Sequence, residues 1–129
     1  MVKFKTIAEF EINGIICPKA RPRFNGSQAY LPEKYRIWKE KTIIELLQQA
    51  RTKSIKTPID QPIYLIVRYF GHANSDADNV SGSIMDALTD AKIIVDDNLN
   101  HIPMLTFIFY KTIMKNAKAI ITLNTYINE

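Results

Sequence analysis

The 129-residue chain is predicted to form a single small α/β domain, in which two main helices pack on a mixed β-sheet. Three observations support this fold class. Alternating or dense apolar runs indicate strands, two apolar stripes at helical spacing indicate helices, and these segments follow one another as strand, helix, strand, helix, strand, strand. No repeat, low-complexity tract or linker divides the chain, so we expect residues 1–129 to form one domain.

The first half of the chain predicts a strand, a loop and a helix. Apolar and polar residues alternate over residues 3–16, which indicates a strand, with Asn13-Gly14 as a turn or bulge signal. Residues 18–31 (PKARPRFNGSQAYL) contain two prolines, a glycine and little periodicity, and are expected to form a loop. A helix is expected from Pro32 to about Arg51, because proline suits a first turn and an apolar stripe follows; Trp38 would anchor this helix to the sheet.

The second half predicts a strand, a helix and two closing strands. Residues 63–70 (IYLIVRYF) are β-branched and aromatic, which indicates a buried strand. Apolar residues spaced by three and four predict a helix over residues 79–91, and residues 93–95 are expected to form a short strand or turn. Strands are expected at about 104–112 and 117–127, joined as a hairpin through Lys115-Asn116.

Composition excludes several classes of protein. No apolar run approaches the roughly 20 residues that span a bilayer, and the N-terminus alternates apolar and charged residues, unlike a signal peptide. Cys17 is the only cysteine, which excludes an intramolecular disulfide and fits a reducing cytosol. Its side chain is expected to be a small core residue. We therefore expect a cytoplasmic protein with no membrane partner.

Charge is distributed unevenly along the chain. Residues 18–56 contain ten Lys and Arg and three Glu, whereas residues 74–97 contain one Lys and six Asp. A basic segment beside an acidic pocket is typical of a protein that grips a polyanion and places a metal ion along it. An ordinary solvated helix face is the alternative explanation for the basic residues 34–56.

Six of the seven aspartates lie in the 22-residue stretch that runs from Asp76 to Asp97. Asp76 and Asp78 open it, and Asp96 and Asp97 close it. Crowded carboxylates repel one another unless a cation lies among them, and divalent cations prefer oxygen ligands. The stretch therefore predicts a Mg²⁺ site, with Mn²⁺ as an alternative ion, at which these four carboxylates meet.

Every acidic residue of the stretch except Asp76 also has a simpler explanation. Asp78 or Asn79 can cap the following helix, and Asp96 and Asp97 can form a turn. The two aspartates within the helix, Asp86 and Asp90, are expected to be solvated or to lie on a packing face. An EF-hand is excluded, because the sixth and twelfth loop positions are not glycine and glutamate.

The pattern D-x-D-N, a helix carrying M-D-A-L-T and a following D-D resembles the RusA family of Holliday junction resolvases. The basic PKARPRF loop resembles the family more loosely. The resemblance implies a RusA-like fold and a homodimeric, Mg²⁺-dependent endonuclease, without an organic cofactor, that resolves four-way DNA junctions in recombination and repair and is common in prophages. It implies that Asp76, Asp78 and Asp97 are the catalytic, metal-binding carboxylates, with Asp96 as an accessory metal ligand and Asn79 as a supporting residue.

One position departs from the family pattern. The resemblance implies a lysine four residues after the second aspartate, where this chain has Gly82. A lysine there would project on the same side of the helix as Asp78, whereas glycine offers no charge. Three alternatives remain open: another cation substitutes, cleavage is slow, or the chain binds branched DNA without cutting it. The possible substitutes are Lys92, Lys19 and Arg21.

The predicted loop supplies the expected DNA contacts. Lys19, Arg21 and Arg23 alternate along a segment that proline holds extended, and such cations pair with phosphates. Phe24 and Tyr30 are expected to anchor the loop, with stacking at a junction opening as the alternative. The two histidines, His72 and His101, are expected on the surface or in loops. A small ion-binding or structural domain that does not bind DNA remains a further hypothesis.

Overall fold

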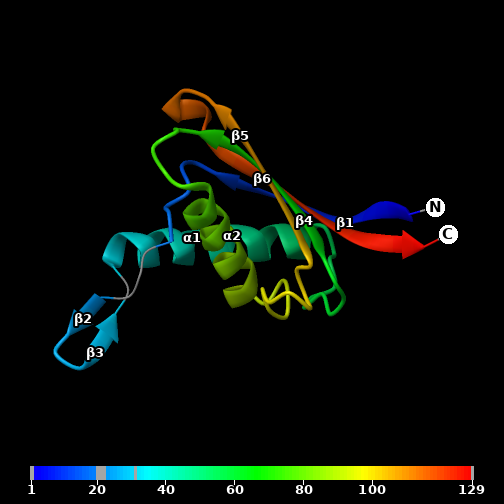
Figure 1. Cartoon of the computed structure of the whole chain (residues 1–129), viewed down its shortest axis with the longest axis horizontal. Helices are drawn as coiled ribbons and strands as arrows, with labels where there is room; N and C mark the ends of the chain where they lie inside the picture. The colour runs from blue at the N-terminus through cyan, green and yellow to red at the C-terminus, as the bar shows by residue number, and fades with distance from the viewer. Residues whose placement is uncertain (1, 20–22, 31, 129) are drawn as a thin grey trace.

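The computed structural model describes residues 2–19, 23–30 and 32–128. Figure 1 shows the path of the chain, in which two helices lie against one four-stranded sheet and a short hairpin stands apart from them. The elements in chain order are β1 (Val2–Asn13), β2 (Arg23–Asn25), β3 (Gln28–Tyr30), α1 (Glu33–Thr52), β4 (Tyr64–Gly71), α2 (Ala77–Asp90), β5 (Met104–Lys111), the 3₁₀ helix η1 (Met114–Asn116) and β6 (Lys118–Asn128).

The main sheet is mixed, as predicted, with the strand order β1-β6-β4-β5. β6 pairs antiparallel with both β1 and β4, whereas β4 and β5 are parallel. The predicted hairpin between the last two strands is wrong, because β4 lies between them and Lys115-Asn116 belongs to η1. Burial explains this order: Ala119, Ile121 and Leu123 of β6 are fully buried and require a central position, whereas β5 remains an edge strand.

Both helices cover the same face of the sheet. Along β4, Leu65, Val67 and Tyr69 are buried, and the residues between them are half-buried. The buried residues belong to one core with Leu46 of α1 and Ile84 of α2. The predicted strand is therefore present, but it is buried on one face only, because the helices cover only that face.

The two predicted helices are confirmed within two residues at each end. Pro32 precedes the first turn of α1, and Trp38 packs against the core with its ring stacked 5.9 Å from that of Tyr35. Cys17 is half-buried, and burial raises the pKa of its thiol although Lys34 acts to lower it. Neither helix is both long and apolar enough to cross a membrane in the part of the chain that the structure describes.

The segment predicted as a loop contains a two-stranded hairpin. β2 pairs antiparallel with β3, with Asn25 opposite Gln28, and Gly26 adopts a positive φ of 66° in the turn. The two central residues are Gly26 and Ser27, and glycine with positive φ at the first of them is typical of a type II′ hairpin turn, but prolines on either side obscured this signal in the sequence. Figure 1 shows this hairpin projecting beyond the start of α1.

Candidate metal centre and nucleic-acid surface

The first acidic pair lies where β4 leads into α2. Asp76 is the residue before the helix, with extended backbone, and its side chain makes no capping hydrogen bond. Asp78 lies in the first turn, where its Oδ1 accepts a hydrogen bond of 3.0 Å from the Asn79 N–H. Both side chains are exposed. The predicted helix cap is therefore Asp76 rather than Asp78 or Asn79, and the Asp76 carboxylate is left available to a ligand.

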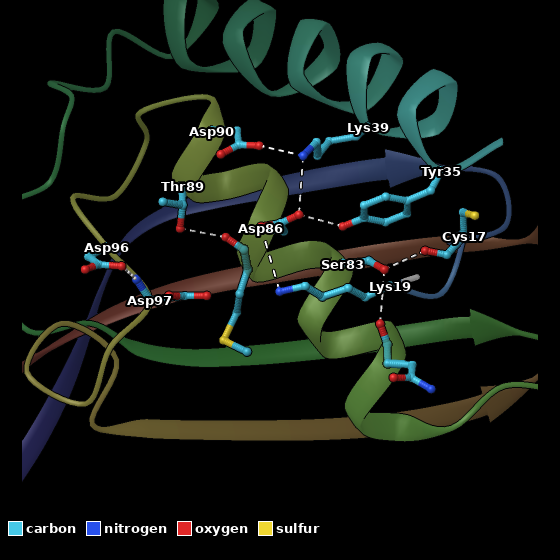
Figure 2. Close-up of polar contacts among 12 residues, drawn as sticks. Cys17, Lys19, Tyr35, Lys39, Ser83, Asp86, Thr89, Asp90, Asp96 and Asp97 are labelled. Atoms are coloured by element: carbon cyan, nitrogen blue, oxygen red, sulfur yellow. Dashed lines mark hydrogen bonds and ion pairs between the residues drawn. The ribbon is translucent and has the colours of Figure 1, made fainter. Parts of the chain in front are cut away.

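The second acidic pair lies in the loop after α2, where Figure 2 shows the Asp96 carboxylate turned toward the backbone nitrogen of Asp97. Asp96 Oδ1 accepts the Asp97 N–H at 2.7 Å, and Asp96 Oδ2 accepts the Asn98 amide at 3.1 Å. Asp96 therefore acts as a turn former, which was the alternative explanation for it. The exposed carboxylate of Asp97 makes no such contact with the part of the chain that the structure describes.

The two pairs do not meet within one chain, so the expectation that four carboxylates gather around one ion is wrong for a single copy. β4, α2 and β5 form a parallel crossover. The helix begins near the C-terminal end of β4, and the chain returns to the N-terminal end of β5. The 14 residues of α2 extend about 21 Å at 1.5 Å per residue. Among the described residues, no three Asp, Glu, His or Cys side chains form a group that could hold a metal ion.

The segment before the hairpin is attached to the first half of α2. The Lys19 N–H donates to the Asn79 carbonyl at 2.9 Å, and the Ser83 hydroxyl donates to the Cys17 carbonyl at 2.5 Å (Figure 2). Gly82 lies between these two contacts. A Cβ on Gly82 would lie 3.3 Å from Lys19 Cδ and 3.7 Å from Lys19 Cβ. Glycine therefore lets the lysine stem cross α2 in close contact.

Lys19 continues along α2 toward a cluster of charged side chains, shown in Figure 2. Its Nζ lies 3.9 Å from Asp86 Oδ1, while Asp86 Oδ2 accepts a 2.7 Å hydrogen bond from the Tyr35 hydroxyl. Lys39 lies 3.4 Å from Asp86 Oδ2 and 2.8 Å from Asp90 Oδ2. Asp86 and Asp90 are therefore paired across the α1–α2 interface, which agrees with a packing face rather than a solvated one.

Burial and charge shift two pKa values in this cluster. Burial raises the pKa of Tyr35 far above its ordinary value, and the hydrogen bond to Asp86 raises it further. Burial acts to lower the pKa of Lys39, but its hydrogen bond to Asp90 and the charge of Asp86 outweigh burial, so this pKa is raised overall. The cluster therefore stabilises protonated Tyr35 and charged Lys39.

A cleft of about 600 Å³ lies at the loop before the first acidic pair, where it is lined by Ser75, the residue that precedes Asp76. Its lining comes from the segment before the hairpin, the start of α1 and the loop that precedes Asp76, and it includes Lys34, Trp38, His72 and Asn74. A cation, an aromatic ring and polar groups beside two exposed carboxylates are suited to a nucleic-acid strand. Composition alone did not single out Lys34 or Trp38 for this role, because only the fold brings α1 beside residues 72–75.

The other predicted site residues have separate positions. Arg21 lies outside the described residues, and Arg23 lies in β2 with its side chain outside the described part. His101 is half-buried and its Nδ1 lies 2.8 Å from Asn98 Oδ1, so it supports the turn beside Asp97. Lys92 follows the C-terminal end of α2, a helix length from Asp78. Of the proposed substitute cations, Lys19 is the one whose described side chain contacts Gly82.

Residues 13–124 match the family model of endodeoxyribonuclease RusA. The chain belongs to the RusA endodeoxyribonuclease family. The match begins at the end of β1 and extends through most of β6, so it contains both acidic pairs, both helices and the cleft. No curated protein sequence matches the chain. The RusA match confirms the resemblance and the mixed α/β fold predicted for it.

The RusA match also places the features that sequence reasoning missed inside the family domain. These are the β2–β3 hairpin, the contact of Lys19 with Gly82 and the Tyr35–Asp86–Lys39 cluster. The hairpin had a local signal in Gly26-Ser27. The other two join residues that are more than 40 positions apart in the sequence, so no local pattern identified them.

Proposed function

We propose that this RusA-family chain is a divalent-metal-dependent endonuclease that resolves four-way DNA junctions as a homodimer. The separation of the acidic pairs carries the proposal. Each end of α2 presents an exposed carboxylate with no hydrogen bond from the described residues, Asp76 at one end and Asp97 at the other. Mg²⁺ takes six oxygen ligands, of which two carboxylates supply only a part, so a third carboxylate from a second copy would bind the ion more tightly.

Two copies of the chain can complete the site. If two α2 helices pack antiparallel about a two-fold axis, the start of one helix lies beside the end of the other. Asp76 and Asp78 of one copy then lie near Asp97 of the second copy, and symmetry creates two equal sites. A two-fold protein with two sites suits a four-way junction, which requires two symmetric cuts.

The surface beside α2 supports such a dimer. β5 is an edge strand, and its helix-facing side chains extend beyond the cover of α1 and α2. Leu105 is 39% exposed and Phe109 is 38% exposed, while Leu99 in the loop after Asp97 is 85% exposed. This apolar stripe, Leu99, Leu105 and Phe109, follows the second acidic pair along the chain. An exposed apolar patch of this kind marks an interaction surface.

The roles of the residues follow from their positions. Asp76, Asp78 and Asp97 would hold Mg²⁺ or Mn²⁺, with Asp96 fixing the loop that carries Asp97. The bound ion would activate a water molecule and stabilise charge on the scissile phosphate. Lys19 would contact a phosphate near Asp78, because its 3.9 Å ion pair with Asp86 is long and its side chain is about half exposed. Lys34 in the cleft would hold the DNA strand that approaches Asp76.

A mixing experiment tests the composite site. Purified Asp76→Asn and Asp97→Asn chains are each expected to leave a synthetic four-way junction uncut with Mg²⁺ or Mn²⁺. In a mixed dimer, one site loses both carboxylates and the other keeps all of them, so mixing the two variants should restore nicking of one strand without paired resolution. Asp60→Asn, which changes an exposed aspartate outside the stretch, serves as the control and should cut like the unchanged protein.

The mixing experiment has two contradicting outcomes. If the mixture remains inactive while the unchanged protein cuts, each site is built within one chain and the composite arrangement is wrong. If the unchanged protein leaves junctions intact with either ion, and Asp76→Asn binds them equally well, the nuclease proposal itself is contradicted.

Gly82 motivates a second function, namely junction binding without cleavage. The contact of Lys19 with Gly82 instead favours cleavage, because it supplies a cation where the helix has none. The exchange variant Gly82→Lys with Lys19→Ala moves this cation onto α2. Increased cutting by the exchange variant would indicate a slow nuclease. Salt-sensitive junction binding without cutting in both proteins would favour the binding function, and absence of any gel shift would contradict both functions.

A further inference from the structure

The most exposed aromatic ring among the described residues lies on the projecting hairpin. Phe24, in the middle of β2, is 72% exposed. Its partner across the hairpin is Ala29, the smallest side chain with a Cβ, so the side chain directly opposite does not cover the ring. The expectation that Phe24 anchors a loop is therefore wrong, because its ring faces solvent rather than the core.

The hairpin itself is held only weakly to the rest of the chain. Its strands β2 and β3 contact each other extensively, but neither makes a comparably extended contact with any other described element. Figure 1 shows the hairpin beyond the N-terminal end of α1. An apolar ring is normally buried, because exposing it to water is unfavourable by about 25 cal/mol per Å². A ring held outward on a projecting arm is therefore a feature that packing of this chain does not explain.

Positive charge on both sides of the hairpin indicates the chemistry of its ligand. Lys19 lies before it, and the exposed residues Lys34 and Arg36 follow it at the start of α1. Cations beside an exposed aromatic ring are the usual means of binding unpaired nucleic acid, in which phosphates contact the cations and base faces stack on the ring. Lys34 also lines the cleft that reaches Ser75, so the cation that follows the hairpin along the chain lies in this cleft.

We propose that Phe24 stacks on an unpaired base at the centre of branched DNA, and that this contact distinguishes a junction from an uninterrupted duplex. In a duplex the base faces are covered by their neighbours, whereas bases at a branch point are readily unstacked. The ring thus adds affinity for the junction alone, while the cations bind either substrate. This inference rests on the proposed function, since it specifies how the same DNA-binding surface selects its substrate.

The test compares junction and duplex binding in EDTA, where cleavage does not interfere. Phe24→Ala is expected to weaken junction binding about tenfold, since stacking contributes about 1–3 kcal/mol per base, and to leave duplex binding unchanged. Phe24→Trp should retain junction affinity, and its indole emission should be quenched by the junction but not by the duplex. Phe4→Ala is the matched control, because Phe4 is 50% exposed on β1, away from the hairpin, and should change neither affinity.

Each result decides between the alternatives. Equal losses on both substrates, or no loss on the junction, would overturn the role of Phe24 while junction binding by the unchanged protein still supports the proposed function. If the unchanged protein binds no DNA, the proposed function fails first. If Phe24→Ala instead changes the molecular mass in solution, a second copy of the chain occupies the ring and the inference is wrong.

Discussion

The side chain of Lys19 crosses the backbone of Gly82, with Lys19 Cδ 3.3 Å from the position that a Cβ on Gly82 would take. The glycine thus creates room on α2 for a cation that arrives from another segment. A hydrogen bond from the Lys19 N–H to the Asn79 carbonyl fixes this crossing one turn from Asp78. The missing side chain at Gly82 and the cation that Lys19 supplies beside it are therefore two parts of the same arrangement.

Gly82→Ala should raise the stability of the protein and lower its cleavage activity. Alanine is better than glycine within a helix by about 1 kcal/mol, and the Lys19 stem is flexible enough to move aside. We therefore expect the free energy of unfolding in urea to rise by up to about 1 kcal/mol while junction cleavage falls. Thr89→Ala, which changes α2 away from Lys19, should leave cleavage unaffected. Unchanged cleavage in Gly82→Ala would show that the position of Lys19 does not matter.

Asp86→Ala should destabilise the protein more than Asp90→Ala. Asp86 accepts the hydroxyl of Tyr35, a residue that is 1% exposed, so its loss leaves a buried donor unpaired. The expected decrease in the free energy of unfolding is about 1–3 kcal/mol. Asp90 is more exposed and pairs with Lys39 alone, so its loss should cost less than about 1 kcal/mol. Equal effects in urea unfolding would contradict this division.

Stability should fall at alkaline pH. The pKa values of Tyr35, Tyr69 and Cys17 are all raised by burial in the folded protein. Each group then loses its proton more readily in the unfolded chain. Its contribution to the free energy of unfolding is therefore complete below its unfolded pKa, near 9–10, and declines as pH rises. For each group, the free energy of unfolding falls by about 1.4 kcal/mol per pH unit in this range.

Tyr35→Phe isolates one of these groups. The variant should be less stable than the unchanged protein at pH 8, because Asp86 loses a hydrogen bond, but its stability should decline less steeply above pH 10. Thermal unfolding measured across this range provides the test. Parallel curves for the two proteins would show that Tyr35 does not contribute to the alkaline loss.

Phe109→Asp should separate a dimer into monomers. A carboxylate in the apolar stripe would have to be desolvated at the proposed interface, whereas the free edge of β5 leaves it in water within a single copy. We expect half the molecular mass in light scattering, a retained fold and loss of metal-dependent cleavage. Ile44→Asp is the control, since Ile44 is exposed on α1. If molecular mass and cleavage are unchanged in Phe109→Asp, the apolar stripe is not part of the dimer interface.

Sequence patterns located both helices and the long strands, because burial of one helix stripe or one strand face leaves a local period in the residues. The pairing of the strands was less accessible. Adjacent positions of β5 and β6 in the chain favoured a hairpin, yet the fully buried Ile121 places β6 in the middle of the sheet and leaves β5 at its edge. Burial of this kind depends on distant segments and is not visible in a local window.

The sequence by itself determined the two helices, the four long strands, the family resemblance and the candidate aspartates Asp76, Asp78 and Asp97. Only the tertiary structure decided where these carboxylates lie, because a parallel crossover places the two ends of α2 near opposite ends of the strands. It also brought Lys19 onto Gly82 and held Phe24 away from the core. The physical reason is that local periodicity follows from burial of single elements, whereas these positions depend on contacts between segments far apart in the chain.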